Sequence, residues 1–266
     1  MSSNESLRRK ESFDAVADSY DSYRSPPPPE VVAAILRVSK LRKGSTVLEI
    51  GCGTGQLSVA LAEHGIALTA VELGPHLAAR AKQNLARFQN IRIDTGSFEA
   101  WPLPAEKFDA VVCANAFHWL DPHLRAAKCA AALRPGGLLT ILHVHHVDGG
   151  TPGFFADTQP LYVKWGMSDD PLYQLPAPDE VPAMYEELHA LPEFSSVQRL
   201  RFEIPQRHTT TSYVGWLTTD SLVNTLDAES KRGFLHDIQR LIESRYNGDV
   251  SRNYVYEIVT AERAAT

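Results

Sequence analysis

The chain has 266 residues, of which 44% are hydrophobic and 22% are charged, a composition typical of a globular protein with a buried core. Its formal net charge of −6 gives no electrostatic reason to bind a phosphate backbone, which argues against nucleic acid as a partner. Three cysteines without CxxC spacing predict neither a disulfide framework nor a zinc site, and favour a cytoplasmic location. The first residues lack the apolar core of a signal peptide, and the absence of a long apolar run argues against a membrane span.

Residues 1–44 predict two helices separated by the four prolines of PPPP. In the first helix Phe13, Val16, Ala17 and Tyr20 recur at i, i+3, i+4 and i+7, which places them on one helical face. The last proline can begin the second helix, because proline is tolerated in a first turn. We therefore treat these residues as an N-terminal helical segment.

Residues 45–147 alternate between short apolar strands and helical segments. Strands are predicted at 46–50, 67–73, 91–96, 108–115 and 138–144. Helices of 10–15 residues between strands indicate crossovers and hence parallel pairing, and nearly continuous apolar strands indicate helices on both faces of the sheet. One predicted helix includes the stretch 122–137, ending at the glycines of RPGG. This segment therefore predicts an α/β fold with a doubly wound, mostly parallel sheet.

Residues 148–266 follow a different pattern, with a proline- and aromatic-rich stretch before two helices and two alternating strands. The helices are predicted at 211–226 and 230–246, and the strands at 197–206 and 253–263. We expect the two strands to join the sheet antiparallel at one edge, giving seven strands. The helical material is expected to form a C-terminal cap over the ligand edge of the sheet.

Three glycines alternate in the segment GCGTG, directly after the first predicted strand. Gly51 permits the turn, Gly53 permits close approach of a ligand to the backbone, and Gly55 permits the next helix to pack on the strand. Ligands of open α/β sheets bind beyond the carboxyl ends of the strands, where strand order reverses, and the first strand borders that point. The sequence therefore predicts a ligand site at this loop.

The spacing around the glycines limits the kind of ligand. Dinucleotide sites favour G-x-G-x-x-G, whereas Gln56 stands here at the position of that third glycine, and the GK[ST] of a phosphate loop is absent. Glu72 ends the second strand about twenty positions after Gly51, where a carboxylate can accept hydrogen bonds from a ribose diol. The pocket is predicted to take a nucleoside with a free ribose.

At this point the chain resembles the class I S-adenosylmethionine-dependent methyltransferases. VLEIGCGTG resembles the first motif of that family, and Glu72 matches its ribose-binding acid. TGSFEAWPLPAEKFDAVVCANAFHWLDP and AAALRPGGLLTIL resemble two later motifs, in the same order and within residues 45–145. The resemblance implies a Rossmann-like methyltransferase fold, S-adenosyl-L-methionine as the cofactor, and transfer of its methyl group.

The resemblance also implies a set of cofactor-binding residues. They are Tyr20, Arg24, Glu49, Gly51, Gly53, Gly55, Glu72, Leu73, Ser97, Phe98 and Asn115. Leu73 would pack on the adenine, and Asn115 would lie near the methionine amino group. Ser97 stands where the family commonly has an aspartate that reads the adenine, so the backbone N–H of Phe98 is expected to contribute. FDAVADSYDSYRSPPPP resembles a lead-in helix that covers the cofactor in a subset of these enzymes.

Methyl transfer is an in-line displacement in which the protein mainly aligns the reactants and excludes water. A carboxylate acceptor needs no base at neutral pH, whereas a hydroxyl acceptor benefits from one. We take His118 and His145 as the candidate catalytic residues. Strand alternation is expected to send His143 and His145 to one face and His146 to the other. No cysteine or acidic partner has convincing spacing to these histidines, so no metal site is predicted.

His118, Trp119, His146 and Trp216 are the predicted substrate-binding residues. The segment FHWLD and the C-terminal pattern resemble the trans-aconitate methyltransferase branch, which modifies small acids. This resemblance implies methylation of oxygen, on a carboxylate or hydroxyl of a small molecule. The aromatic residues Trp165, Tyr213 and Trp216 of the predicted cap could enclose a hydrophobic small molecule, or could equally form the core of the cap itself.

Alternative functions remain open from the sequence. An RNA methyltransferase would share the same motifs, although the acidic composition argues against it. A non-catalytic nucleoside-binding module of the same fold is a further alternative. A nicotinamide-dependent oxidoreductase is disfavoured by Gln56. We expect a small-molecule partner, no membrane partner, and a monomer or a homodimer.

Overall fold

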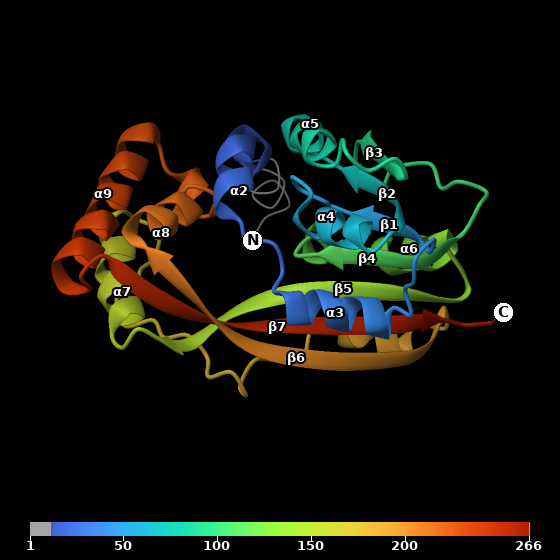
Figure 1. Ribbon diagram of the computed structural model, residues 1–266. Helices are drawn as coiled ribbons and strands as arrows, with labels where there is room; N and C mark the ends of the chain where they lie inside the picture. The colour runs from blue at the N-terminus through green and yellow to red at the C-terminus, as the bar shows by residue number, and fades with distance from the viewer. Residues whose placement is uncertain (1–11, 266) are drawn as a thin grey trace. The chain divides into compact units, whose positions relative to one another are not determined.

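The computed structural model describes residues 12–265, which group into two compact units (Figure 1). The first unit comprises residues 12–24, 145–182 and 203–255, and the second comprises residues 25–144, 183–202 and 256–265. Three long strands contribute residues to both units. They are β5 Leu133–Gly150, β6 Phe194–Thr209 and β7 Asp249–Arg263. The units are discontinuous along the chain, so the division at residues 44 and 147 stays a prediction. Part of the helix predicted over residues 1–24 lies outside the described residues.

The strands form a single sheet in the order β3-β2-β1-β4-β5-β7-β6 (Figure 1). The remaining four strands are β1 Thr46–Ile50, β2 Ala67–Glu72, β3 Ile91–Thr95 and β4 Phe108–Ala114. The first five strands of the chain pair in parallel, as predicted from the helices between them. The predicted seven-stranded, mostly parallel α/β sheet is therefore confirmed.

The last two strands complete one side of the sheet in the antiparallel sense. The guanidinium of Arg263 at the end of β7 donates to the carbonyl of Leu133 at the start of β5. Thr151, which follows β5, donates its N–H to the carbonyl of Ser251 near the start of β7, at 3.0 Å. Contacts between β6 and β7 likewise join the start of one strand to the end of the other. β6 lies at the edge, as its alternating pattern predicted.

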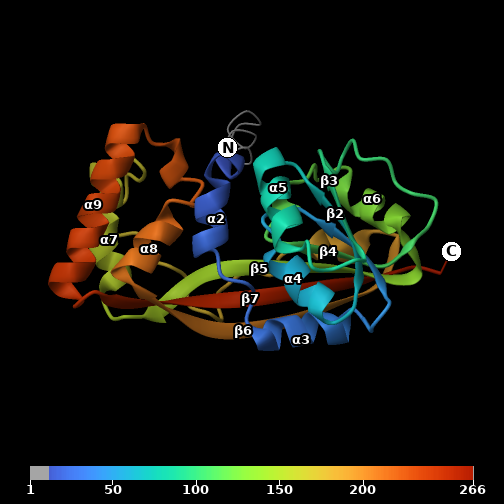
Figure 2. The ribbon, with the colours of Figure 1, turned by 45° about the horizontal axis from the view of Figure 1, so that its top comes forward.

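Helices cover both faces of the parallel strands in the second unit (Figure 2). They are α3 Pro29–Val38, α4 Gln56–Glu63, α5 Pro75–Asn84 and α6 Arg125–Ala132. Successive residues of β2 point to opposite faces: Ala70 packs in a cluster with residues of α4 and α5, and Val71 packs in a cluster with residues of α6. Burial on both faces explains why these strands lack a polar alternation.

The segment between α6 and β5 differs from the prediction. The helix expected over 122–137 is confined to α6, and β5 already begins at Leu133. Leu133 pairs with Phe108, the next pair is Leu138 with Ala110, and the register shifts between them. The residues of RPGG therefore form an irregularity within the strand, not the end of a helix. β5 also extends past the predicted end at residue 144.

The helices of the first unit pack around an aromatic core. They are α2 Ala17–Tyr23, α7 Phe154–Lys164, α8 Thr210–Leu217 and α9 Ala228–Arg245. Gly215 and Gly233 provide close approaches, because a Cβ there would lie 2.3 Å from the Tyr23 ring and 2.0 Å from the Trp165 ring. Within residues 12–265, no helix is both long and apolar enough to cross a membrane.

The predicted helix over 211–226 is interrupted after α8. The carboxylate of Asp220 accepts from the N–H groups of Leu222 and Val223, at 2.9 and 3.1 Å. These hydrogen bonds make a turn that competes with a continuing helix. The chain then forms only the short 3-10 helix η4 Val223–Thr225 before α9.

Candidate functional site

The glycine loop lies where the strand order reverses. The chain passes from β1 outward to β2 and β3, and then returns to the other side of β1 to form β4. Loop 51–55 follows β1 and thus borders the reversal, as predicted. Glu72, Ser97 and Asn115 end or follow the neighbouring strands, so the topology brings these predicted residues to the same edge of the sheet.

Gly51 permits a close approach between two loops of the protein. Its φ is +69°, and a Cβ at this position would lie 2.5 Å from the Cβ of Ala116 in the loop after β4. A side chain at Gly51 would therefore be strained by its backbone and would collide with Ala116. The glycine permits the loops after β1 and β4 to meet at the reversal point.

The carboxylate of Glu72 joins two loops. One of its oxygens accepts from the backbone N–H of Gly53 at 2.8 Å, and the other accepts from the N–H of Gly74 at 2.9 Å. The Glu72 residue is buried, with 6% of its surface exposed. Each carboxylate oxygen can accept more than one hydrogen bond. The two backbone contacts are therefore compatible with the predicted binding of ribose hydroxyls by Glu72.

Gly55 has φ +98° and stands at the N-cap of α4. A Cβ there would contact Leu85 at 3.4 Å and Ala81 at 3.8 Å, so the neighbour that it accommodates is the α5 region and not the strand that we expected. The side-chain amide of Asn84 donates to the carbonyl of Thr54 at 2.9 Å. These contacts from α5 hold the loop in place.

Glu49 lies beneath the loop on β1 and is 1% exposed. The hydroxyl of Ser58 on α4 donates to its carboxylate at 2.6 Å. Burial raises the pKa of Glu49 to about 7, with the charge of Glu72 adding to the rise and the Ser58 hydrogen bond opposing it. Glu49 is therefore a carboxyl group that titrates near neutral pH inside the fold.

The three cysteines are buried free thiols. Cys52 belongs to the glycine loop and is 5% exposed. Burial raises the pKa values of Cys52, Cys113 and Cys129, and so disfavours their thiolate forms. These residues therefore act as small apolar core groups.

The predicted adenine-binding residues follow β2 and β3. The Ser97 hydroxyl donates to the Glu99 carboxylate at 2.5 Å, and that carboxylate also accepts from the N–H of Asp121 at 3.2 Å. The ring of Phe98 is buried in the core with 3% of the residue exposed, so only its backbone can meet a ligand. Leu73 is half-buried.

The loop after β4 carries the predicted residues Asn115, His118 and Trp119. Asn115 has φ +52°, a left-handed conformation that asparagine tolerates, and its side-chain oxygen accepts from the N–H of Val144 on β5 at 2.9 Å. His118 and Trp119 belong to the 3-10 helix η2 Phe117–Trp119, with their ring centroids 4.8 Å apart. This loop is thus tied to β5.

His118 contacts a residue that the prediction left outside the catalytic set. Its ring centroid lies 5.2 Å from that of His143 on β5. The His143 Nδ1 lies 3.3 Å from the hydroxyl of Tyr185, whose residue is 5% exposed and has φ +62°. His118, His143 and Tyr185 therefore form a connected cluster in the second unit.

Arg125 supports this cluster from α6. Its guanidinium donates to the carbonyl of Phe117 at 3.0 Å and pairs with Glu187 at 2.6 Å, in the 3-10 helix η3 Glu186–Ala190. It also lies 5.5 Å from the ring centroid of Tyr185. Sequence reasoning missed Arg125 and Tyr185, because no local spacing connects α6 with the irregular stretch before η3.

The environment of His118 makes it a weak base. Desolvation, followed by the charge of Arg125, lowers the pKa of His118, although the residue as a whole is exposed and solvent screens part of this effect. The imidazole is therefore neutral at pH 7 and has little affinity for a proton. Burial also raises the pKa of Tyr185, which keeps its phenol protonated.

The remaining predicted residues belong to the first unit. The Arg24 guanidinium donates to Thr219, with 2.7 Å between Nε and Oγ1, and lies 5.6 Å from the ring centroid of Tyr20 and 5.0 Å from that of Trp216. The ring centroids of Trp216 and His146 are 5.5 Å apart. The first unit thus brings the N-terminal and C-terminal candidates together. His145 is half-buried on β5. No cluster of three or more His, Cys, Asp or Glu residues suited to a metal ion occurs in residues 12–265.

Known proteins share this architecture and part of this sequence. Residues 47–137 match the family model described as a methyltransferase domain. Over 131 residues the chain is 34% identical to the "Uncharacterized methyltransferase Rv3342" of Mycobacterium tuberculosis (strain ATCC 25618 / H37Rv), which covers 49% of this chain and 51% of that protein. Over 99 residues it is 38% identical to a ubiquinone biosynthesis O-methyltransferase of Coxiella burnetii (strain Dugway 5J108-111), covering 36% of this chain and 42% of that protein.

The fold resembles a SAM-dependent methyltransferase from Geobacter sulfurreducens, solved in complex with S-adenosyl-L-homocysteine. The TM-score is 0.52 at 17% sequence identity, and the match covers 90% of this chain and 95% of that one. The chain spans about half the length of the first curated relatives that it matches. Residues 47–137 are therefore similar to methyltransferase domains, and the fold is similar to that of a solved methyltransferase.

Proposed function

We propose that the protein is an S-adenosyl-L-methionine-dependent methyltransferase that methylates an oxygen atom of a small molecule. The observation that carries this proposal is the Glu72 carboxylate, held 2.8 Å from the Gly53 N–H at the reversal point of the sheet. It lies within the region matched to methyltransferase domains. A buried carboxylate at the end of the second strand suits the diol of an adenosine ribose.

The residues around the loop fit this cofactor. Gly53 presents backbone without a side chain at φ +59°, Glu72 presents two carboxylate oxygens, and Phe98 can offer only its backbone. We propose that Leu73 packs against the adenine and that Asn115 lies near the amino acid part. Glu49, Gly51, Gly55 and Ser97 remain proposed cofactor-binding residues, with Gly51 and Gly55 lining the methionine part together with Gly53. Tyr20 and Arg24 remain the proposed contacts to the cofactor carboxylate.

The bound cofactor would supply a methyl group on a positively charged sulfur, which is already activated for transfer. The protein then has to orient the acceptor oxygen and exclude water. We propose that His118, Trp119, His146 and Trp216 position the acceptor. The lowered pKa of His118 makes it less suited to remove a proton from a hydroxyl group. This favours an acceptor that is already ionised at pH 7, namely a carboxylate.

An acidic acceptor agrees with the resemblance to the trans-aconitate methyltransferase branch, and we propose that the chain belongs to that branch. The Coxiella relative is named as an O-methyltransferase, which also fits oxygen as the acceptor atom. His145 is retained as a second proposed catalytic residue. The free buried cysteines support the proposed cytoplasmic location.

Titration calorimetry with S-adenosyl-L-homocysteine tests the cofactor assignment, with NAD as the comparison ligand. We expect binding of the first compound and none of the second. Incubation with S-adenosyl-L-methionine and a panel of acids and phenols, with S-adenosyl-L-homocysteine as the readout, then tests the reaction. Lack of any heat with S-adenosyl-L-homocysteine would refute the proposal, and exclusive methylation of phenols or RNA would refute the acidic acceptor.

A further inference from the structure

The first unit contains a buried guanidinium on β7. Arg252 is 4% exposed. Its Nη1 donates to the hydroxyl of Tyr213 at 3.0 Å, its Nη2 lies 3.4 Å from the Nδ1 of His146, and its Cζ lies 4.8 Å from the ring centroid of Phe155. All of these neighbours belong to the same unit. The sequence analysis did not include Arg252 among the site residues.

The side chains that contact the Arg252 guanidinium in the described part of the chain, Tyr213, His146 and Phe155, carry no negative charge at neutral pH. Within residues 12–265, no carboxylate oxygen lies within 4.0 Å of its guanidinium, and its buried Nε has no hydrogen-bond partner. A guanidinium stays protonated in proteins, so the charge persists. Buried charges are normally paired, because removal from water without a counter-ion is strongly unfavourable.

Another buried charged residue in this chain is paired with oppositely charged side chains, as buried charges usually are. Glu257, in the second unit, is 0% exposed, and its Oε1 pairs with Arg199 and with Arg201, each at 2.8 Å. The fold therefore neutralises that interior carboxylate with its own side chains. Within residues 12–265 no such pair is present for Arg252, which leads us to expect its counter-ion from outside this part of the chain.

The surroundings of Arg252 indicate the kind of anion. His146 packs against Trp216 and Tyr254, with ring centroids 5.5 and 5.0 Å apart, and Tyr213 packs between Phe154 and His208. Aromatic rings around a single cation suit a carboxylate attached to an apolar body. The planar fork of a guanidinium also matches the two oxygens of a carboxylate.

We propose that Arg252 binds the carboxylate of a small organic acid, and that this acid is the methyl acceptor. The second part rests on the function proposed above. His146 and Trp216, already proposed as substrate-binding residues, would contact the body of the acid. The carboxylate of the bound acid would then be the counter-ion of the Arg252 guanidinium, which has none within residues 12–265.

Thermal unfolding with matched ligand pairs tests this proposal. Benzoate, phenylacetate and succinate are compared with their neutral carboxamides, and inorganic phosphate is a separate arm. We expect at least one carboxylate to raise the melting temperature of the wild-type protein more than its amide does. In Arg252→Met the affinity for that acid should fall about 10- to 100-fold, the range for a lost charge-assisted hydrogen bond. Equal responses to acid and amide, or stabilisation by phosphate alone, would overturn the proposal.

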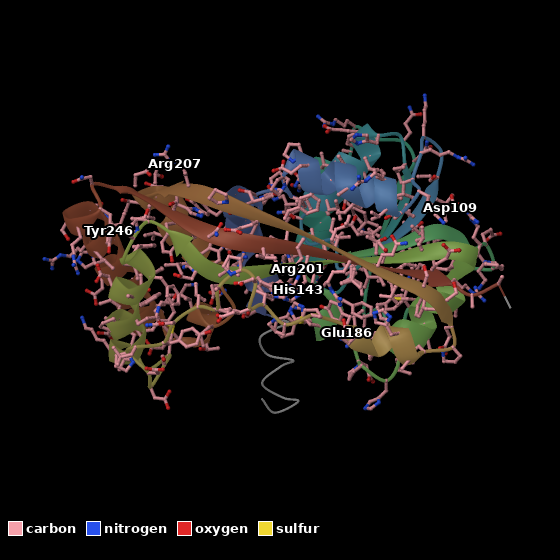
Figure 3. The ribbon with its side chains drawn as sticks, turned by 90° about the horizontal axis from the view of Figure 1, so that it is seen from below. Asp109, His143, Glu186, Arg201, Arg207 and Tyr246 are labelled. Carbon is pink, nitrogen blue, oxygen red and sulfur yellow. The ribbon has the colours of Figure 1, made fainter. Side chains whose placement is uncertain are left out.

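Arg207→Gln is the matched control, because Arg207 is an exposed cation of the same unit that pairs with Asp249 (Figure 3). It should leave the carboxylate response unchanged. Arg252→Lys serves if the methionine variant does not fold, and it should retain the charge but bind the acid more weakly. An undiminished carboxylate response in either Arg252 variant would also overturn the proposal.

Calorimetry with S-adenosyl-L-homocysteine on the same preparations separates the two proposals. If this compound binds while the carboxylate response does not depend on Arg252, the acid site is wrong and the cofactor assignment stands. If the carboxylate response depends on Arg252 while S-adenosyl-L-homocysteine does not bind, the acid site stands and the methyltransferase function is wrong.

Discussion

Replacement of Glu72 by glutamine tests whether one carboxylate both holds the glycine loop and binds the ribose. In the wild-type protein its two oxygens accept from the N–H groups of Gly53 and Gly74. The glutamine side chain keeps one acceptor oxygen and turns an N–H₂ group toward the other backbone donor. One of the two hydrogen bonds is therefore lost, and the remaining one loses its charge.

The expected loss of stability follows from these two bonds. A hydrogen bond to a charged group contributes about 1.5–3 kcal/mol, so Glu72→Gln should lower the free energy of unfolding by about 2 kcal/mol. For a chain of this size that corresponds to a fall in melting temperature of about 4–8 °C. If Glu72 also binds the ribose, the affinity for S-adenosyl-L-homocysteine should fall about 10- to 100-fold.

Thermal unfolding and titration calorimetry measure the two effects separately. Glu63→Gln is the control, because Glu63 is exposed, pairs with Arg87 and lies outside the loop. It should change stability by less than about 1 kcal/mol. An unchanged melting temperature in Glu72→Gln would refute the loop role. A lowered melting temperature with unchanged affinity would refute the ribose role and leave the loop role intact.

Two further predictions concern the same loop. The pKa of Glu49 near 7 exceeds its ordinary value of 4.5, so the folded state keeps a proton that the unfolded state has lost between these pH values, and stability falls as pH rises. Glu49→Gln should remove this slope and be more stable than wild type at pH 8, by about 3 kcal/mol in urea unfolding; an unchanged slope would contradict it. Gly51→Ala should cost at least about 3 kcal/mol, from left-handed strain and collision with Ala116. Gly44→Ala has φ +86° and no atom within 4 Å of the added Cβ, so it should cost only about 1–2 kcal/mol, and equal losses in the two variants would exclude the collision.

The parallel core could be predicted from sequence because its signals are local. Apolar strands of five to eight residues, separated by helices and glycines, were predicted close to the observed bounds of β1 to β4. The sequence underestimated β5, because the glycines that normally end a helix here lie within an irregular strand. The length of a strand depends on its partners, which the local pattern does not contain.

Only those residues of the candidate site that belong to a local sequence motif could be predicted. Gly51, Gly53 and Glu72 were found because a turn and the end of a strand identify them. Tyr185 and Arg252 were not assigned to the site, since each acquires its importance from contacts with residues more than thirty positions away. Burial without a counter-ion is a property of the folded chain, and no residue spacing predicts it.

The reactivity of the buried Cys52 thiol reports how often the glycine loop opens. Because the thiolate is the reactive form and burial suppresses it, a thiol reagent should modify Cys52 only when the loop opens. The rate of alkylation at this position, followed by peptide mass spectrometry, therefore measures local opening in the native protein. A compound that occupies the loop should slow this reaction, so ligands can be detected without any assay of turnover.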